Sequence, residues 1–500
     1  MTSWIKVHRK NVQSTIKPII QPIIQPTMPI TNIIIVSTEH IIGIANNIKN
    51  ILEKNNIIVK IINNLSKEEC LISTYDTLYI ILYQYNHNTP KRYILYQMEQ
   101  YNSNNIIQHI SKMNNSEAVW EFSMKNYEKY NIPIQKLWYQ PVPYYDYTYI
   151  ENKDYKYDIL FYGVLNKRRK DILKELSKRY RVFYSGTIFG KEKEEYIKLS
   201  KIIINLHYHK DAVLETSRIN DALIYNKIII SENSKYTDRF IHYMYKDLVV
   251  YFDEINENLS NINQLYDIID TYLTVTHDIK KDNLIQLSEF FLLKNLVPFG
   301  IVKNILYDIS HHIYCISLLE NYNRSNLFFK QDVPQNVIIY PAIKYNPGWI
   351  GRGLSYQNLI WNAKRCNIHK ITICEDDFLF PLDFNEQYED IHSFLDIMNN
   401  WDIFVGFMTN VDKNVIIKNI YRYKNKIFLN ITHVTSTIFT IYNHTIYDTI
   451  IHYNMDNTID KYISSCNVNI IAQCILSNEE YNKLFEIYDI IDITDPSILL

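Results

Sequence analysis

The chain has 500 residues, which is more than one hydrophobic core normally covers, so we expect two or three domains. Hydrophobic residues make up 47% of the chain and charged residues 21%, as in a soluble globular protein. The net charge is only -2, and acids and bases are mixed along the chain, which argues against nucleic acid as the main partner.

The six cysteines are scattered and form no CxxC pair, which argues against a disulfide framework or a zinc ribbon and favours free buried thiols. No apolar run reaches the roughly 18–20 residues needed to span a bilayer, and no signal peptide is visible. We therefore expect a cytoplasmic protein without a membrane span.

The first 31 residues are predicted to be an extended leader, because prolines at every fourth position from Pro18 to Pro26 forbid a helix. From residue 32 on, β-branched runs alternate with helical spacing, which predicts a parallel sheet covered on both faces. The expected strands are residues 32–37, 57–62, 77–83 and 92–98, with a helix at 44–54 and a turn-rich linker at 139–143.

A second alternating unit begins after the linker. Its expected strands are residues 158–163, 181–184, 201–206 and 227–231, and its expected helices are 168–180, 191–199, 215–225 and 284–296. Two consecutive α/β units joined by a linker are typical of a pair of facing Rossmann-like halves.

The third region opens with two predicted strands at residues 312–318 and 336–340. A glycine-bearing loop is predicted at 347–353, followed by a helix at 354–366. A buried strand at 370–374 then runs directly into three consecutive acids, Glu375, Asp376 and Asp377, which we call the acidic motif.

The acidic motif is the sharpest chemical feature of the sequence. Three carboxylates at a strand end cannot all be buried without partners, and the carboxyl ends of parallel strands are where α/β sheets bind ligands. A bound Mn²⁺ or Mg²⁺ that bridges a diphosphate satisfies both conditions. The alternative is a solvated acidic loop. A Walker B motif is set aside because the chain contains no GxxxxGK[ST].

The context of the acidic motif carries a family resemblance. Gly351, Ser355, Ala363 and the acidic motif resemble, in order and spacing, the lipopolysaccharide-biosynthesis and collagen-type galactosyltransferase family, and the match covers roughly residues 313–470. The family commonly has Cys and His where this chain has Arg352 and Tyr356.

The resemblance implies a GT-A fold, in which the acidic motif contacts the donor's ribose and the metal on its diphosphate. The implied donor-binding residues are Arg324, Gly351, Ser355, Glu375 and Asp376, and the metal ligands are Glu375, Asp377 and His433. Two further acids, Asp402 and Asp460, are candidate catalytic bases. For Asp402 the alternative is an ordinary acid at a strand edge.

A second resemblance covers the first two units. Residues 96–100, 119–123 and 137–141, followed by 160–163, 166–169, 201–207 and 215–218, resemble a bacterial GT-B glycosyltransferase group. In such enzymes the nucleotide sugar lies between the halves, mainly on the second one. The implied donor-binding residues are Gly163, Arg168, His207, Glu215 and Arg218.

Structural explanations of these residues remain open. An acid such as Glu215 is favoured at a helix start by the helix dipole, and it could simply pair with Arg218 one turn on. His207 at a strand end is also typical of a structural histidine. The pair of acids eight residues apart that many GT-B enzymes have is missing, because residue 223 is leucine.

Together these patterns predict an α/β glycosyltransferase of hexosyltransferase type with GT-B-like halves at 32–145 and 146–308 and a GT-A-like domain at 309–500. A bifunctional enzyme would transfer sugars from nucleotide-diphosphate donors to a glycan acceptor. One alternative is a single active C-terminal domain with an acceptor-binding first module. Another is a carbohydrate-binding or assembly protein without activity.

Overall fold

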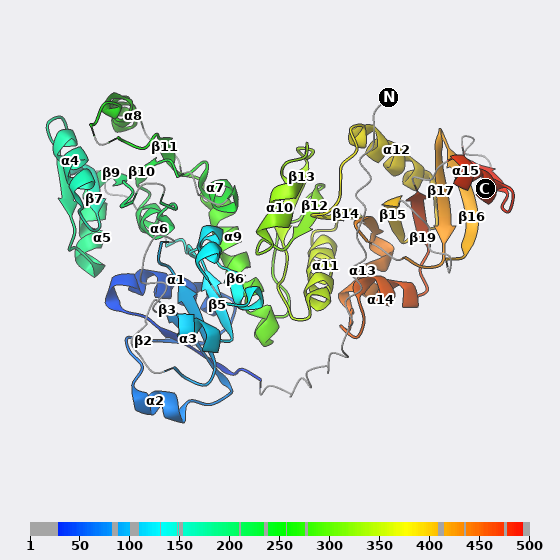
Figure 1. Ribbon diagram of the computed structural model, residues 1–500, viewed down its shortest axis with the longest axis horizontal. Coiled ribbons are helices and arrows are strands. Elements are labelled where there is room, and N and C mark those ends of the chain that lie inside the picture. Colours follow the sequence, from blue (N-terminus) through cyan, green and yellow to red (C-terminus); the bar gives the residue numbers. More distant parts are fainter. Residues whose placement is uncertain are drawn as a thin grey trace.

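The computed structural model describes residues 29–82, 89–100, 110–130, 132–147, 149, 154–209, 212–234, 239–256, 258–275, 279–408, 415–434, 437–474 and 478–493. Most of the predicted leader, up to residue 28, lies outside the described residues. The described elements form three β-sheets that follow one another along the chain. In Figure 1 the first two sheets lie on the left, one below the other, and the third lies on the right.

The first sheet contains six strands in the order β2-β1-β3-β4-β5-β6, and all of its pairs are parallel, as predicted. Its central strands are largely apolar because both faces are covered; every residue of β3 is buried. The elements are β1 (Asn32–Val36), α1 (Ile42–Lys54), β2 (Val59–Ile62), α2 (Lys67–Ile72), β3 (Thr77–Leu82), β4 (Tyr93–Gln97), α3 (Ile110–Asn115), β5 (Ala118–Glu121) and β6 (Leu137–Tyr139).

The second sheet is also parallel, with the order β11-β10-β9-β7-β8. The chain runs from β7 to β8 on one side and then crosses to β9 on the other, so the strand order reverses between β7 and β9. The elements are β7 (Tyr157–Tyr162), α4 (Lys167–Leu176), β8 (Val182–Ser185), α5 (Gly190–Lys198), β9 (Ser200–Asn205), α6 (Thr216–Ile224), β10 (Ile228–Glu232), α7 (Arg239–Tyr245), β11 (Val250–Phe252), α8 (Ile262–Thr274) and α9 (Asp282–Lys294).

The third sheet contains nine strands in the order β13-β12-β14-β18-β15-β19-β17-β16-β20. It is mixed, because β12, β13 and β14 are parallel whereas β18 runs antiparallel to both β14 and β15. The elements are β12 (Ile313–Ser317), α10 (Tyr322–Phe328), β13 (Val337–Pro341), α11 (Gly348–Arg365), β14 (Lys370–Glu375), α12 (Phe384–Ile397), β15 (Ile403–Met408), β16 (Ile417–Tyr423), β17 (Lys426–Ile431), β18 (Phe439–Asn443), α13 (Tyr447–Ile451), α14 (Ile459–Ser465), β19 (Ile470–Cys474), α15 (Asn478–Phe485) and β20 (Ile490–Asp492).

The glycine-bearing loop predicted at 347–353 is wrong, because α11 already begins at Gly348. The glycines serve close packing instead. A Cβ atom on Gly351 would lie 2.3 Å from the Ile343 backbone oxygen, and one on Gly353 would lie 2.2 Å from the ring of Tyr453. Glycine at these two positions therefore lets α11 pack directly against its neighbours.

The third sheet is joined to the first through buried polar contacts. The backbone N–H of Tyr139 in β6 donates to Glu320 Oε1 at 2.9 Å, and Glu320 is only 4% exposed. Lys344 donates to the backbone oxygen of Leu137 at 2.5 Å, and Asn295, just after α9, donates to the backbone oxygen of Tyr139 at 3.0 Å. The carboxyl ends of β12 and β13 thus contact the edge strand of the first sheet.

Among the residues that the structure describes, no helix is both long enough and apolar enough to cross a bilayer.

Candidate functional sites

The acidic motif lies where β14 ends, beside the end of its parallel neighbour β12. Ser317 is the last residue of β12, and its hydroxyl donates to Asp376 Oδ2 at 2.7 Å. Glu375 and Asp376 are largely buried, whereas the Asp377 side chain is 47% exposed. The motif therefore combines two enclosed carboxylates with one that is open to solvent.

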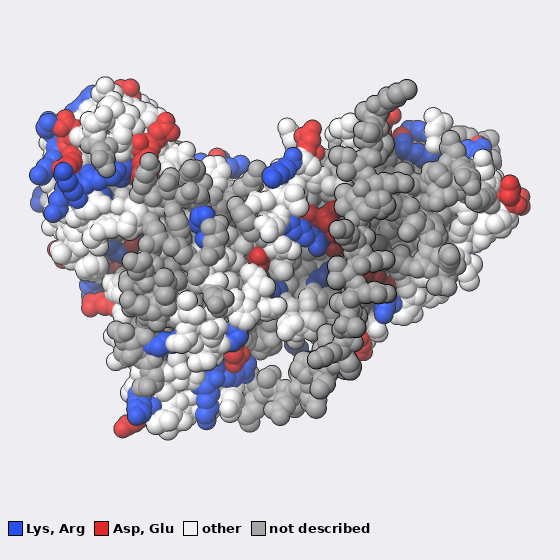
Figure 2. Space-filling view, in the orientation of Figure 1, with Lys and Arg blue, Asp and Glu red and all other residues white. Residues whose placement is uncertain are grey.

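Two arginines from different helices converge on the acidic motif. Arg324 on α10 forms ion pairs with Asp376 and, at 2.9 Å, with Asp377. Arg352 on α11 lies 2.6 Å from Glu375 Oε1. Figure 2 shows acidic and basic side chains next to each other in the area of α10 and β14.

Glu375 is buried next to the hydroxyl of Tyr356, and this environment shifts its pKa. The buried Tyr356 hydroxyl lies 3.1 Å from Glu375 Oε1 and donates to the backbone oxygen of Thr437 at 2.8 Å. Burial raises the pKa of Glu375 to about 7, against the opposing charge of Arg352 and with a further rise from Asp377. Burial likewise raises the pKa of Asp376.

Asp460, a predicted base, lies at the same site. It is in the first turn of α14, and its Oδ1 accepts a hydrogen bond from Thr437 Oγ1 at 2.9 Å. Arg352 bridges Asp460 and Glu375, because its Nη2 atom is 3.3 Å from Asp460 Oδ1. The structure thus brings Arg324, Asp460 and the acidic motif together from separate parts of the sequence.

Asp402, the other predicted base, lies at the opposite edge of the sheet. The Asn443 backbone N–H donates to the Asp402 backbone oxygen at 2.9 Å, and Asn443 pairs with Lys370 at the start of β14. Lys370 and Glu375 are five positions apart along β14, so Asp402 is at least roughly 17 Å away from Glu375. Its carboxylate instead accepts hydrogen bonds from Thr445 and from the backbone of Asn469.

Gly351 and Ser355, predicted to bind the donor, are buried in the packing of α11. Ser355 Oγ donates to the Gly351 backbone oxygen at 2.7 Å and accepts from the Ile343 N–H at 2.9 Å. These contacts fix α11, which carries Arg352 and Tyr356, against residue 343. A direct contact of Gly351 or Ser355 with a donor stays a prediction.

The predicted metal ligands Glu375, Asp377 and His433 do not form a complete metal-binding group. His433 follows β17, and its Nδ1 lies 3.0 Å from Thr432 Oγ1. Across the described part of the chain, no three His, Cys, Asp or Glu side chains are grouped so as to hold a metal ion. The residues present fit an ion held by the open Asp377 together with the donor's diphosphate, since Mg²⁺ commonly takes one or two carboxylates plus phosphates.

A second polar cluster lies at the switch point between β7 and β9, where open α/β sheets bind ligands. Gly163 follows β7 with a φ of +131°, and a Cβ atom there would lie 2.7 Å from Arg218 Nη2 and 3.9 Å from Arg169 Nη1. Burial, with the neighbouring charge of Arg218, lowers the pKa of Arg169 to about 9. Two guanidinium groups next to a strand-end glycine suit an anion such as a phosphate.

His207 and Glu215 form the centre of this cluster. His207 Nδ1 lies 2.7 Å from Glu215 Oε2, and Asn205 at the end of β9 donates to the same oxygen at 3.0 Å. Burial opposes the charged form of both groups, but their mutual attraction outweighs it. The pKa of His207 is therefore raised, and the pKa of Glu215 is lowered to about 2, with help from Arg218 and Arg169.

Arg168, predicted to clamp phosphate, is committed to a buried ion pair with Glu232 at the end of β10. It also donates to the backbone oxygens of Ile255 and His207, at 2.9 and 3.2 Å. Four of the predicted residues thus lie around one point: Gly163, His207, Glu215 and Arg218. Arg168 lies beside them and contacts the backbone of His207.

Several residues of the two sites were missed by sequence reasoning. Asn205 and Glu232 each end a β-branched strand, which is the same signal that identified the acidic motif. Thr437 carried no such signal, because it reaches the acidic motif only through the pairing of β14 with β18.

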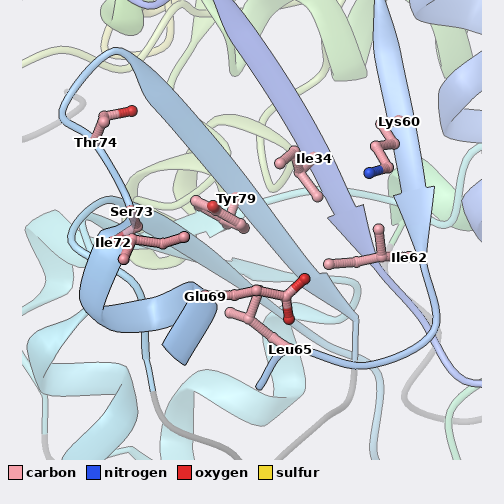
Figure 3. Close-up of a pocket in the computed structure, with 9 residues that line it drawn as sticks. All are labelled: Ile34, Lys60, Ile62, Leu65, Glu69, Ile72, Ser73, Thr74 and Tyr79. Atoms are coloured by element: carbon pink, nitrogen blue, oxygen red, sulfur yellow. The ribbon is translucent and has the colours of Figure 1, made fainter. Parts of the chain in front are cut away.

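A cavity of about 170 Å³ lies away from both clusters, on the first sheet under α2. Figure 3 shows the side chains of Ile34, Ile62, Leu65 and Tyr79 around it, together with those of Lys60 and Glu69. The lining mixes apolar and polar side chains, and Glu69 is already engaged in the capping box of α2 with Ser66. Nothing in this lining is arranged for catalysis.

No family model matches the chain. It is 35% identical over 127 residues to an uncharacterized protein of Acanthamoeba polyphaga mimivirus; the match covers 23% of this chain and 44% of that relative, less than half of its length. Among solved structures, the crystal structure of an alpha1,3-fucosyltransferase aligns with 52% of this chain over 94% of its own length, at 12% identity and a TM-score of 0.25. A TM-score this low does not establish a shared fold.

Proposed function

We propose that the chain is a glycosyltransferase that uses a nucleoside-diphosphate sugar at the carboxyl end of β14. The observation that carries this proposal is the convergence of Arg324, the acidic motif and Asp460 at one point. The third sheet as a GT-A-like domain, and the first two as GT-B-like halves, belong to the same proposal.

Within this site, Asp460 is the proposed general base. Its carboxylate is held in place by Thr437 and Arg352. The acceptor's hydroxyl oxygen bonds to the anomeric carbon, the bond from that carbon to the diphosphate breaks, and the hydroxyl proton passes to Asp460. A Mn²⁺ or Mg²⁺ ion held by Asp377 would supply positive charge to the departing diphosphate.

The polar cluster of Gly163, His207, Glu215 and Arg218, which we call the switch-point cluster, supports the bifunctional form of the proposal. Gly163 and Arg218 provide the glycine and a cation that a second diphosphate needs, and Glu215 can hold ribose hydroxyls. The alternative is a single active C-terminal site, with the first two sheets serving to bind the glycan acceptor. Separate mutations in the two clusters distinguish these forms.

The test is a panel of nucleotide sugars assayed for transfer and hydrolysis with Mn²⁺, with Mg²⁺ and with a chelator. We expect Asp377→Ala to abolish a metal-dependent activity, whereas Asp396→Ala, an exposed acid on α12, preserves it. An unchanged activity in Asp377→Ala would overturn the C-terminal site. Loss of a second activity in Glu215→Ala, but not in the exposed Glu192→Ala, supports bifunctionality; a single activity that survives Glu215→Ala supports the alternative.

A further inference from the structure

Arg324 and Arg352 occupy most of the carboxylate oxygens at the C-terminal site. Asp376 is held by Arg324 on one oxygen and by Ser317 on the other. The two oxygens of Asp460 lie 3.3 and 3.4 Å from Arg352. A metal ion that used these carboxylates would first have to displace a guanidinium.

Glu375 is engaged in the same way. Its Oε1 atom lies 2.6 Å from Arg352 and 3.1 Å from the Tyr356 hydroxyl, and its Oε2 atom lies 3.9 Å from Arg324. Arg352 is enclosed, with a side chain only 29% exposed, and its Nη2 atom also donates to Thr437 at 2.5 Å. Removing its acids would leave a partly buried guanidinium unpaired, which is strongly unfavourable.

Asp377 differs from the other three acids. Its side chain is 47% exposed and contacts Arg324 through Oδ2 at 2.9 Å. One exposed carboxylate is a poor binding site for a hydrated divalent ion, because ion and carboxylate gain little in water. A diphosphate adds further oxygen ligands, and one carboxylate then suffices.

The charges explain why the diphosphate in turn needs the ion. When ionised, the four carboxylates of Glu375, Asp376, Asp377 and Asp460 face two guanidinium groups, so two negative charges remain uncompensated. A diphosphate alone would add to this negative charge. A divalent ion that arrives with the diphosphate cancels two of the added negative charges, so the site accepts the diphosphate more readily with the ion than without it.

We infer that Arg324 and Arg352 are built-in cations that make metal binding conditional on the diphosphate. They are positioning residues: they hold Glu375, Asp376 and Asp460 in place and keep these acids from chelating a metal ion. The inference rests on the proposed function, because it assumes a diphosphate donor at this site.

The experiment measures binding of Mn²⁺ to the full chain by electron paramagnetic resonance, with Mn²⁺ alone and with UDP or GDP. We expect the unmodified protein to bind Mn²⁺ at least tenfold more tightly when the matching nucleoside diphosphate is present. Arg352→Met and Arg324→Met are expected to bind Mn²⁺ alone at least tenfold more tightly than the unmodified protein. Arg352→Lys keeps the charge and is expected to behave like the unmodified protein.

Arg365→Met is the matched control, because Arg365 lies on the same helix α11 but contacts Tyr307 and Asp308. The inference is overturned if the unmodified protein binds Mn²⁺ equally well with and without nucleotide, or if neither methionine variant gains affinity. Should Arg352→Met fail to fold, Arg324→Met, at a side chain that is 38% exposed, decides the outcome. If neither nucleotide binds, with or without Mn²⁺, the proposed function fails, and the methionine variants still show whether the arginines block the ion.

Discussion

Gln100 and Val213 are joined by two hydrogen bonds across the boundary between the first and second sheets. Gln100 Nε2 donates to the Val213 backbone oxygen at 3.0 Å, and the Val213 N–H donates to Gln100 Oε1 at 2.9 Å. Val213 is buried and precedes Glu215 by two residues. A side chain that follows β4 therefore fixes the backbone that leads into the switch-point cluster.

Gln100→Ala removes both hydrogen bonds and leaves the buried backbone groups of Val213 without this partner. We expect the free energy of unfolding to fall by about 1–3 kcal/mol, the usual cost of an unsatisfied buried polar group. Urea unfolding checks this value. Gln264→Ala, on the exposed side of α8, serves as the control and should change stability by less than about 0.5 kcal/mol.

The pair of His207 and Glu215 makes stability depend on pH in two opposite directions. The pKa of Glu215 is lowered from 4.5 to about 2, so its contribution is present above pH 4.5 and is lost as the pH falls toward 2. The pKa of His207 is raised from 6.5, so its contribution is complete below pH 6.5 and is lost as the pH rises through the raised value. The pair therefore stabilises most between about pH 4.5 and 6.5.

Glu215→Gln should remove this window. We expect a loss of about 3 kcal/mol near pH 5.5, because a buried imidazolium is left without its carboxylate, and a smaller loss once the pH has risen through the raised pKa of His207. Unfolding free energies of both proteins across this range give the answer. A loss that is equal at pH 5.5 and above that pKa would show that the two groups are not coupled.

Gly163→Ala is expected to strain the second sheet at its switch point. The backbone angle φ of +131° disfavours a side chain, and the new methyl group would lie 2.7 Å from Arg218 Nη2. A loss of about 1–3 kcal/mol follows from the strained backbone, and Arg218 must shift. Thermal unfolding compares this variant with Gly348→Ala, where a Cβ atom meets nothing within 4 Å.

Gly351→Ala tests the contact that places α11. The added methyl group would lie 2.3 Å from the Ile343 backbone oxygen, and backbone cannot move aside as a flexible side chain can. We expect a loss of about 1–3 kcal/mol from overpacking. Because Arg352 is the next residue, the same change should also alter Mn²⁺ binding with nucleotide, measured on the folded protein, whereas Gly348→Ala leaves both properties unchanged.

Sequence patterns predicted the parallel strands well, because residues such as those of β3 and β9 are β-branched, apolar and buried on both faces. The position of the acidic motif at a strand end followed from the same pattern. The place of Asp402 did not, because it depends on strand direction. β14 and β15 both run antiparallel to β18, so an acid that precedes β15 cannot lie beside one that ends β14.

The loop predicted at 347–353 failed for a different reason. Three glycines within six residues normally disfavour a helix, since glycine loses the most backbone freedom on folding. Here Gly351 and Gly353 face the backbone of Ile343 and the ring of Tyr453, contacts that only the folded chain reveals. Tertiary packing therefore overrides the low helix propensity of this segment. Tertiary contacts also enclose Arg169 of α4, which donates to the backbone oxygen of Leu206 just after β9.

Glu320 lies on the short segment that links β12 to α10, and Arg324 follows four residues later within α10. Glu320 is anchored to the Tyr139 backbone of the first sheet, and Arg324 is bound to the acidic motif of the third. Residues 320–324 therefore contact both the first sheet and the third. The first sheet and the acidic motif are thus held by residues only four positions apart, so the place of Arg324 beside Asp377 depends on where the first sheet lies.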